Sequence, residues 1–382
     1  MRTAVVSFYE AYPPDSGAAS VTYHCAKHAT GERAIIQVGE CEQRAVTHDG
    51  VRVYTLPGAR SRVERLLRMR WTIGRMVEVC GEVDPDVVFL EGASWTVYLL
   101  GLMRALRRAA SRAVIVYHAH NVEYVLRREK QGPLVAAITR WAEKHLFREA
   151  DVAFAVSGVD RQQIEALYGV RTHVLPNGVD AERFGRVPQE QIDSVRARYG
   201  LGDPSVLFMG FYTYQPNREA IDRLVESVFP LVLAKRRDAK LVVIGSRIPH
   251  ARRWLICPGS IAYDELPAFM AACTVGVAPI RSGSGTRLKI LEYLAAGLPV
   301  VSTAKGAEGL DLRHQCHLEI AEDDKDFADA AVRLLEEPDR AKTLAERGRA
   351  FVRQNYAWTA ILPRCFATIE RRLLKRSEQS LG

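Results

Sequence analysis

A short glycine-rich segment followed by two cations and a carboxylate has the clearest chemical meaning in this sequence. Gly283 and Gly285 belong to the segment, and Arg287, Lys289 and Glu292 come directly after it. Glycine lets backbone N–H groups approach an anion closely, and the start of a helix turns its positive end toward that anion. Because a carboxylate accepts hydrogen bonds from sugar hydroxyls, the pattern predicts a site for a diphosphate that carries a ribose.

The spacing of the charged residues limits how they can act together. Arg287 and Lys289 are two positions apart and do not share a helix face, so they converge only if Arg287 lies in the loop or the first turn. Gly285 and Thr286 are expected to offer backbone N–H groups. Two plainer alternatives stay open, namely a solvated Lys289 and an ion pair between Lys289 and Glu292 within one helix.

Length and composition predict a soluble globular protein with two domains. The chain has 382 residues, of which 48% are hydrophobic and 26% charged. We find no apolar run of about 18 residues and no signal peptide, so a cytoplasmic protein is expected, with a peripheral location at the inner membrane face as a further option. The net charge of +8 suits an anionic substrate or membrane surface. No nucleic-acid-binding motif is recognisable, and the oligomeric state is not predicted.

Metal and disulfide sites are not expected. The cysteines are scattered, odd in number and never paired as CxxC, which favours a reducing compartment and argues against structural zinc; they are Cys25, Cys41, Cys80, Cys257, Cys273, Cys316 and Cys365. Two D-x-D triplets, Asp84–Asp86 and Asp324–Asp326, are not interpreted as metal motifs. The first precedes a predicted strand, at the wrong end for a ligand, and the second opens a predicted surface helix.

Apolar runs that alternate with helical patterns predict an α/β fold with buried parallel sheets. The predicted strands are Thr3–Phe8, Ala34–Val38, Val51–Leu56, Val87–Leu90, Ala113–Tyr117, Val152–Val156, His173–Leu175, Val206–Phe208, Leu241–Ile244, Val275–Ala278, Val300–Ser302 and Leu318–Ile320. The predicted helices include Ser61–Cys80, Val97–Ala109, Val135–Glu149, Ala220–Lys235 and Phe327–Glu336.

The domain boundary is predicted in the segment LPNGVD, Leu175–Asp180, because a second series of strands starts at Val206. Each half then suits a Rossmann-like unit, with ligands beyond the carboxyl ends of the strands. The glycine-rich segment follows the strand Val275–Ala278 and therefore lies at such an end.

The helix Ser61–Cys80 has a basic and apolar pattern with two alternative meanings. Its arginines and apolar residues interleave: Arg60, Arg62, Arg65, Arg68, Arg70 and Arg75 with Val63, Leu66, Leu67, Met69, Trp71 and Ile73. A basic amphipathic helix can rest on anionic lipid. The alternative is a helix that docks on its own sheet with its arginines in water.

Six motifs, in order, resemble the retaining GT-B glycosyltransferases of family 4, also called group 1 glycosyl transferases. They are PPDSGAA (Pro13–Ala19), HNVE (His120–Glu123), PNGVDAERF (Pro176–Phe184), FMGFYTYQPNREA (Phe208–Ala220), GSGTRLKILEYLAAGLPVVST (Gly283–Thr303) and YAWTA (Tyr356–Ala360). The resemblance implies two Rossmann-like domains facing across a cleft, residues 1–178 for the acceptor and 179–356 for a nucleotide-sugar donor. It also implies that the last helix, about 357–382, packs back on the first domain.

The resemblance further implies the chemistry and its residues. A sugar moves from a nucleoside diphosphate, more commonly UDP than GDP, to an acceptor hydroxyl with retention of configuration and without a metal. The implied catalytic residues are His120, Arg287 and Lys289, and the implied donor-binding residues are Gly17, Gly285, Thr286, Arg287, Lys289, Glu292 and Glu308. By strand alternation His118 points to the same side as His120, so which of the two faces the donor is left open.

Two departures from the family pattern shape these expectations. Ser284 stands where many members carry a first glutamate, and Arg218 is the only cation near the first strand of the second domain. The chain therefore resembles a subgroup with a G-T-R-x-K loop, in which Arg287 and Lys289 supply the cations. A nucleotide-sugar epimerase and a non-catalytic sugar-nucleotide-binding subunit stay open as alternatives. The acceptor, whether a small molecule, a lipid-linked sugar or a glycan, is not predicted.

Overall fold

The structure is a computed structural model of the whole chain. It describes residues 1–14, 16–40, 43–59, 61–92, 95–109, 112–202, 204–283 and 285–381. Cys41, Arg60 and Ser284, which the sequence analysis singled out, lie outside the described residues.

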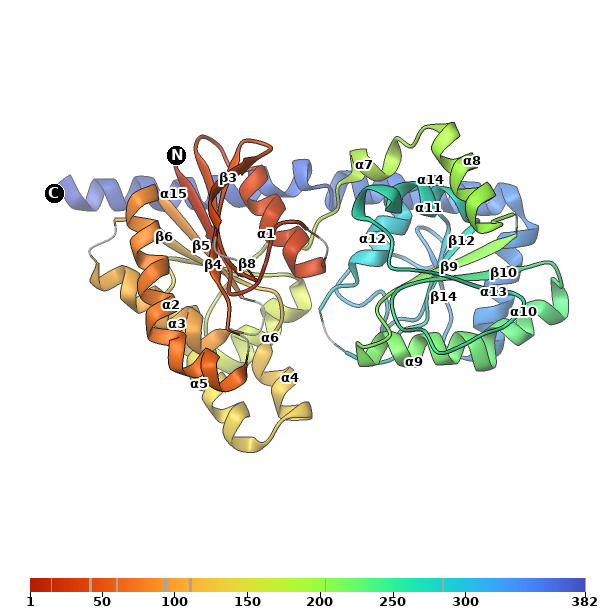
Figure 1. Cartoon of the computed structure of the whole chain (residues 1–382), viewed down its shortest axis with the longest axis horizontal. Coiled ribbons are helices and arrows are strands. Elements are labelled where there is room, and N and C mark those ends of the chain that lie inside the picture. Colours follow the sequence, from red (N-terminus) through yellow and green to blue (C-terminus); the bar gives the residue numbers. More distant parts are fainter. Residues whose placement is uncertain are drawn as a thin grey trace. The chain divides into compact units, whose positions relative to one another are not determined.

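The chain divides into two compact units (Figure 1). Unit 1 consists of Met1–Asn177 and Ile361–Gly382, and unit 2 consists of Gly178–Ala360. The predicted first boundary, after residue 178, lies one residue later than this one. Each unit has its own sheet and its own buried core.

The sheet of unit 1 has the strand order β3-β4-β2-β1-β5-β6-β7-β8. All neighbours pair in parallel except β3 and β4, which are antiparallel. The strands are β1 Thr3–Val6, β2 Arg33–Gly39, β3 Gln43–His48, β4 Val51–Pro57, β5 Val87–Gly92, β6 Val114–Ala119, β7 Val152–Ala155 and β8 His173–Val174. Helices connect the parallel strands: α1 Gly17–Lys27, α2 Arg62–Val83, α3 Thr96–Arg108, α4 Glu123–Lys130, α5 Pro133–Glu149 and α6 Gly158–Tyr168.

The sheet of unit 2 is parallel throughout, in the order β11-β10-β9-β12-β13-β14. This is the 3-2-1-4-5-6 order of a dinucleotide-binding fold. The strands are β9 Ser205–Met209, β10 Lys240–Ile244, β11 Leu255–Gly259, β12 Val275–Ala278, β13 Val300–Ser302 and β14 Glu319–Ile320. The helical segments are α7 Ala181–Gly185, α8 Gln189–Tyr199, α9 Gln215–Arg223, the π-helix Leu224–Val228, α10 Phe229–Lys235, the 3₁₀ turn Tyr263–Glu265, α11 Leu266–Ala272, α12 Leu288–Ala295, α13 Asp324–Glu336 and α14 Pro338–Asn355.

The sheets are buried on both faces, and successive side chains along a strand point to opposite faces. Leu90 of β5 belongs to the apolar core that includes residues of α2 and α3. Phe89, one residue earlier, points to the other face, where its ring lies 5.9 Å from that of Phe366. The long apolar runs in the sequence follow from this burial on both faces.

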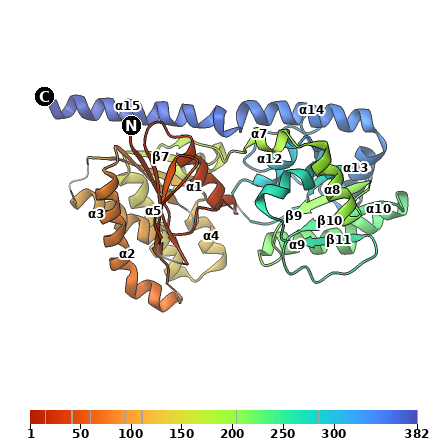
Figure 2. The ribbon, with the colours of Figure 1, turned by 45° about the horizontal axis from the view of Figure 1, so that its top comes forward.

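The last helix, α15 (Trp358–Leu381), lies along unit 1 (Figure 2). Besides the contact of Phe366, Arg376 donates to the carbonyl oxygen of Ala113 over 2.9 Å, and Arg372 lies 3.6 Å from the carboxylate of Asp151. In the described part of the chain, no helix is both long enough and apolar enough to cross a membrane.

Candidate functional site

The glycine-rich segment leaves β12 at its carboxyl end and leads into α12. Gly283 and Gly285 have positive φ angles of 90° and 76°, which L side chains rarely adopt. A Cβ atom on Gly283 would also lie 3.0 Å from Cγ of Pro216. The chain therefore needs glycine here both for the turn and for the close approach to α9.

Arg287 is the residue that caps α12 at its amino end, so it lies outside the regular helix. Its guanidinium donates to the carbonyl oxygen of Gly285 and, over 3.3 Å, to that of Ser282. Thr286 lies between Gly285 and Arg287 and is partly buried. Because Arg287 lies at the end of the loop, outside the regular helix, it and Lys289 can contact the same ligand.

Lys289 lies in the first turn of α12 and is partly buried rather than solvated. Its Nζ donates to Oδ1 of Asn217 over 2.8 Å and lies 4.2 Å from the ring centroid of Phe208. Burial, with a contribution from the nearby charge of Arg287, lowers the pKa of Lys289 to about 7. The ammonium therefore lacks a full counter-charge and would gain one from a bound diphosphate.

Glu292 lies one turn further along α12, and its carboxylate has no hydrogen-bond partner among the described residues. Among the described residues, Lys289 and Glu292 do not form an ion pair. The alternative that these two residues only pair with each other within the helix is therefore excluded. Burial raises the pKa of Glu292 to about 7, although the charges of Lys289 and Arg183 act in the opposite direction.

The end of β9 completes this part of the site. Gly210 follows β9, and a Cβ atom there would lie 2.6 Å from the side chain of Asn217. Asn217 reaches Lys289 because β9 and β12 are neighbours in the sheet, at the point where the strand order reverses. Dinucleotide-binding folds hold their ligands at this point. No role was predicted for Asn217, although it lies in the motif FMGFYTYQPNREA.

Glu308 lies in the loop after β13, whereas Lys289 and Glu292 lie on α12. It pairs with Lys305, with 2.5 Å between Nζ and Oε2, and its side chain is 41% exposed. A Cβ atom on Gly306, in the same loop, would lie 2.7 Å from the carbonyl oxygen of Ala278, so the loop packs closely against the end of β12. The structure thus brings Asn217, Arg287, Lys289 and Glu292 together, and holds Glu308 on the neighbouring loop.

In unit 1 two histidines and a buried glutamate form a second group of ionisable residues. His118 on β6 is fully buried, and His120, just after β6, is 6% exposed. Oε2 of Glu91, at the end of β5, lies 3.0 Å from Nδ1 of His118 and 2.5 Å from Nε2 of His120. Burial by itself raises the pKa of Glu91, but the two imidazoles outweigh it and hold the pKa at about 2.

Glu91 was not predicted as a site residue, because it ends an apolar strand with no motif around it. Its register partner on β6 is His118, so both side chains point to the same face of the sheet. Gly17 lies elsewhere in unit 1, as the exposed first residue of α1, which Ser16 caps.

Unit 1 also contains an open cavity of about 780 Å³ between the ends of its strands and α2. Aromatic and basic side chains line part of it: Phe8, Trp95, Tyr98, Arg65 and Arg68. The guanidinium of Arg65 lies 4.7 Å from the ring centroid of Trp95. An aromatic face beside a cation is suited to a sugar ring that carries an anionic group.

Comparisons with known proteins match both halves of the chain. The family model described as Glycosyltransferase Family 4 matches residues 16–183, and the one described as Glycosyl transferases group 1 matches residues 203–337. A GDP-mannose-dependent alpha-mannosyltransferase of Mycobacterium tuberculosis is 29% identical over 366 residues, which are 91% of this chain and 91% of that protein.

Other relatives and solved structures agree with these matches. A GDP-mannose-dependent alpha-(1-6)-phosphatidylinositol monomannoside mannosyltransferase of Mycolicibacterium smegmatis is 29% identical over 306 residues, 74% of this chain and 76% of that protein. Sucrose-phosphate synthase from Thermosynechococcus elongatus has a TM-score of 0.76 at 17% identity and covers 98% of this chain and 99% of its own. Anabaena HepE in complex with UDP and glucose has a TM-score of 0.73 at 17% identity, covering 97% and 99%.

Proposed function

We infer, from the premise that the chain is a glycosyltransferase of GT-B fold, that it transfers mannose from GDP-mannose to an acceptor hydroxyl with retention of configuration. The observation that carries this inference is the pair Lys289 and Glu292. Both groups are partly buried, neither has a full counter-charge, and both have pKa values of about 7. Such groups are typical of a site that is completed by its ligand.

The choice of donor rests on the names of the relatives. The mannosyltransferases of Mycobacterium tuberculosis and Mycolicibacterium smegmatis are named as GDP-mannose-dependent. Uridine was expected as the commoner base, but HepE, whose structure contains UDP, is similar at only 17% identity. We therefore propose guanosine as the base and mannose as the sugar.

The proposed reaction needs stabilisation of the departing diphosphate. When the bond from the anomeric carbon to the phosphate oxygen breaks, negative charge grows on the diphosphate, and Arg287 and Lys289 meet it. The leaving phosphate takes the proton of the acceptor hydroxyl, whose oxygen bonds to the anomeric carbon on the same face. An α-configured donor then gives an α-linked product, which agrees with the names of the relatives. We assign a hydrogen bond to the donor to His120 rather than to His118, because His120 has some exposed surface and His118 has none.

The acceptor is proposed to be a glycolipid, bound in the cavity beside Trp95 and Arg65. The named acceptor of one relative is a phosphatidylinositol monomannoside. Next to this cavity, α2 exposes apolar residues to solvent: Val63, Leu66, Leu67 and Trp71. Exposed apolar side chains among arginines suit a helix that rests on an anionic membrane, so we propose that α2 holds the enzyme against its lipid acceptor.

A donor screen tests the proposed transfer. The protein is incubated with GDP-mannose, UDP-glucose and other nucleotide sugars, with and without a phosphatidylinositol mannoside, and nucleotide release is measured. Acceptor-dependent release of GDP from GDP-mannose is expected, and NMR of the product should show an α linkage. Interconversion of the nucleotide sugar without acceptor would identify an epimerase, and tight binding without turnover would identify a binding subunit. Either outcome contradicts the proposal.

Vesicle flotation tests the role of α2. The double variant Leu66→Glu, Leu67→Glu should lose binding to vesicles of anionic phospholipid at low salt. The matched control is Leu374→Glu on α15, since Leu374 is 65% exposed and Leu66 is 67% exposed. Equal flotation of the double variant and the wild type would rule out α2 as the membrane contact.

A further inference from the structure

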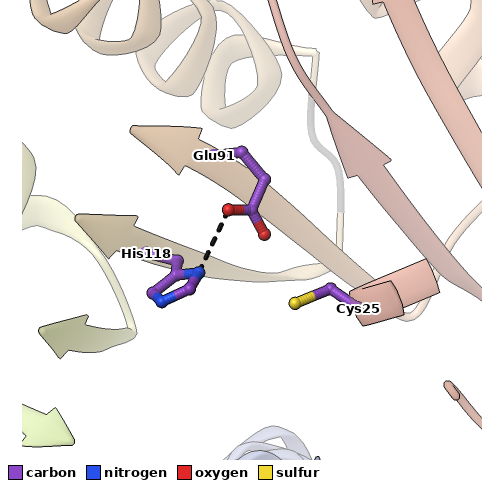
Figure 3. Close-up of side chains that lie close together, drawn as sticks. All are labelled: Cys25, Glu91 and His118. Atoms are coloured by element: carbon purple, nitrogen blue, oxygen red, sulfur yellow. Dashed lines mark hydrogen bonds and ion pairs between the residues drawn. The ribbon is translucent and has the colours of Figure 1, made fainter. Parts of the chain in front are cut away.

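A cysteine, a glutamate and a histidine from three separate elements converge in the interior of unit 1 (Figure 3). Cys25 comes from α1, Glu91 from the end of β5 and His118 from β6, and each is 0% exposed. One potential ligand atom of each side chain lies within 4.8 Å of the other two. In the sequence these residues are far apart and follow no metal-binding motif.

The carboxylate of Glu91 turns one of its two oxygens into the cluster. Oε1 of Glu91 is buried, and Figure 3 shows it turned toward Cys25 rather than His118. The thiol of Cys25, a weak donor, is the one group in the described part of the chain that can donate to it. Oε2 faces His118 and His120 instead. A weak donor compensates a buried carboxylate oxygen poorly, and a cation beside it would do so better.

The orientation of His118 points to the same conclusion. Its Nε2 lies 3.3 Å from the carbonyl oxygen of Leu175, which can only accept, so Nε2 carries the proton. The other ring nitrogen, Nδ1, faces the cluster and lies 3.0 Å from a carboxylate oxygen of Glu91. A backbone carbonyl that fixes the far nitrogen is also the usual partner of a metal-binding histidine.

We propose that Cys25, Glu91 and His118 bind a divalent cation of the zinc type. Sγ of Cys25, Oε1 of Glu91 and Nδ1 of His118 are the ligand atoms. Thiolate and imidazole favour zinc over magnesium or calcium, which prefer oxygen. Binding releases the thiol proton, and one thiolate and one carboxylate then balance the charge of the cation. The loaded site is neutral, as its complete burial requires.

The site differs from what the sequence predicted, because the scattered cysteines argued against structural zinc. The fold brings the ligands together: α1 covers the face of the sheet to which the register partners Glu91 and His118 point. The cation would link α1 to two strands, while Oε2 of Glu91 keeps its contact with His120. This inference is independent of the proposed transferase activity.

Metal analysis of the full-length protein tests the site. The protein is expressed with added zinc, dialysed, and denatured in the presence of a chromogenic zinc indicator. One zinc ion per chain is expected for the wild type, and loss of that zinc for Cys25→Ser and for Glu91→Gln. The matched control is Cys80→Ser, because Cys80 is also a buried cysteine of unit 1 and should not affect zinc content.

Cobalt substitution of the wild type decides the question even if a variant fails to fold. Protein expressed in zinc-depleted medium with cobalt should show a thiolate-to-cobalt charge-transfer absorption band. A wild type without bound zinc and without this band would overturn the proposal. Zinc that persists in both ligand variants would overturn it as well, because the metal would be bound elsewhere.

Discussion

Two buried or partly buried glutamates, one in each unit, lie near the carboxyl ends of parallel strands and behave in opposite ways. Burial raises the pKa of both. In unit 1 the two imidazoles outweigh burial and hold the pKa of Glu91 at about 2. In unit 2 the charges of Lys289 and Arg183 do not outweigh it, and the pKa of Glu292 is about 7. The difference lies in direct side-chain contacts, which Glu91 has and which Glu292 lacks among the residues that the structure describes.

This contrast separates a carboxylate with direct partners in its own unit from one for which we propose a ligand as partner. Oε2 of Glu91 is matched by the two histidines and contributes to the stability of unit 1. Lys289 and Glu292 are desolvated without direct ion pairing, which costs stability and is typical of a binding site. If this distinction holds, substitutions in the two places should affect different measurements.

The largest effect is expected for Glu91→Gln. Removal of one partner from a buried charged cluster costs about 3 kcal/mol, so urea unfolding should show a free energy of unfolding lower by that amount. Glu292→Gln is the matched variant of unit 2 and should leave the free energy of unfolding unchanged or slightly higher. Equal destabilisation by the two variants would break the comparison.

Lys289→Ala should weaken binding of GDP by about 100-fold, because one charge-assisted contact to the diphosphate is lost. The free energy of unfolding should not fall, since a desolvated ammonium is removed as well. Isothermal titration calorimetry measures the affinity. Lys235→Ala, which removes an exposed lysine paired with Asp329, is the control and should bind GDP normally. Normal GDP binding by Lys289→Ala would refute the site.

Glu292→Gln should weaken binding of GDP by about tenfold, the loss of a hydrogen bond to a charged acceptor. Its affinity for pyrophosphate should stay unchanged, because we expect the carboxylate to contact the ribose rather than the phosphates. Glu226→Gln, at an exposed position, serves as control. A parallel loss of pyrophosphate binding would instead place Glu292 at the phosphates.

A smaller change in the affinity for GDP, of a few fold, is expected when the pH is raised. The pKa of Lys289 in the free protein is about 7, so the ammonium is present below that pH and is lost above it. Loss of this charge should therefore lower the affinity for GDP as the pH rises through about 7. Lys289→Arg keeps its charge throughout and should lack this fall. The same fall in Lys289→Arg would assign it to another group.

Sequence patterns predicted the buried strands well and the side-chain contacts less well. The strands Val275–Ala278 and Val300–Ser302 have the same bounds in the structure, because buried parallel strands are continuous apolar runs. The strands β3 and β11 were missed, since QRAVTH is largely polar and LICPG contains a proline. These two lie at the edges of their sheets, where burial imposes no apolar run.

The candidate site was predictable where neighbouring residues form it and not where distant ones do. The cations and the carboxylate after the glycines lie within one short segment, so their grouping was visible in the sequence. The contact between Asn217 and Lys289 joins residues 72 positions apart. Glu91 meets its histidines only because β5 and β6 are neighbours in the sheet. Such contacts follow from strand order, which periodicity does not specify.

The way in which the chain enters and leaves unit 2 has a consequence for how such proteins change over time. Unit 2 is one continuous stretch, and its two ends are held side by side, because Val179 and Ala357 form a parallel bridge and N–H of Val179 donates to the carbonyl oxygen of Tyr356 over 2.9 Å. Exchange of one internal DNA segment can therefore replace the whole of unit 2 without cutting either sheet. Recombination can in this way join an existing unit 1 to a new unit 2.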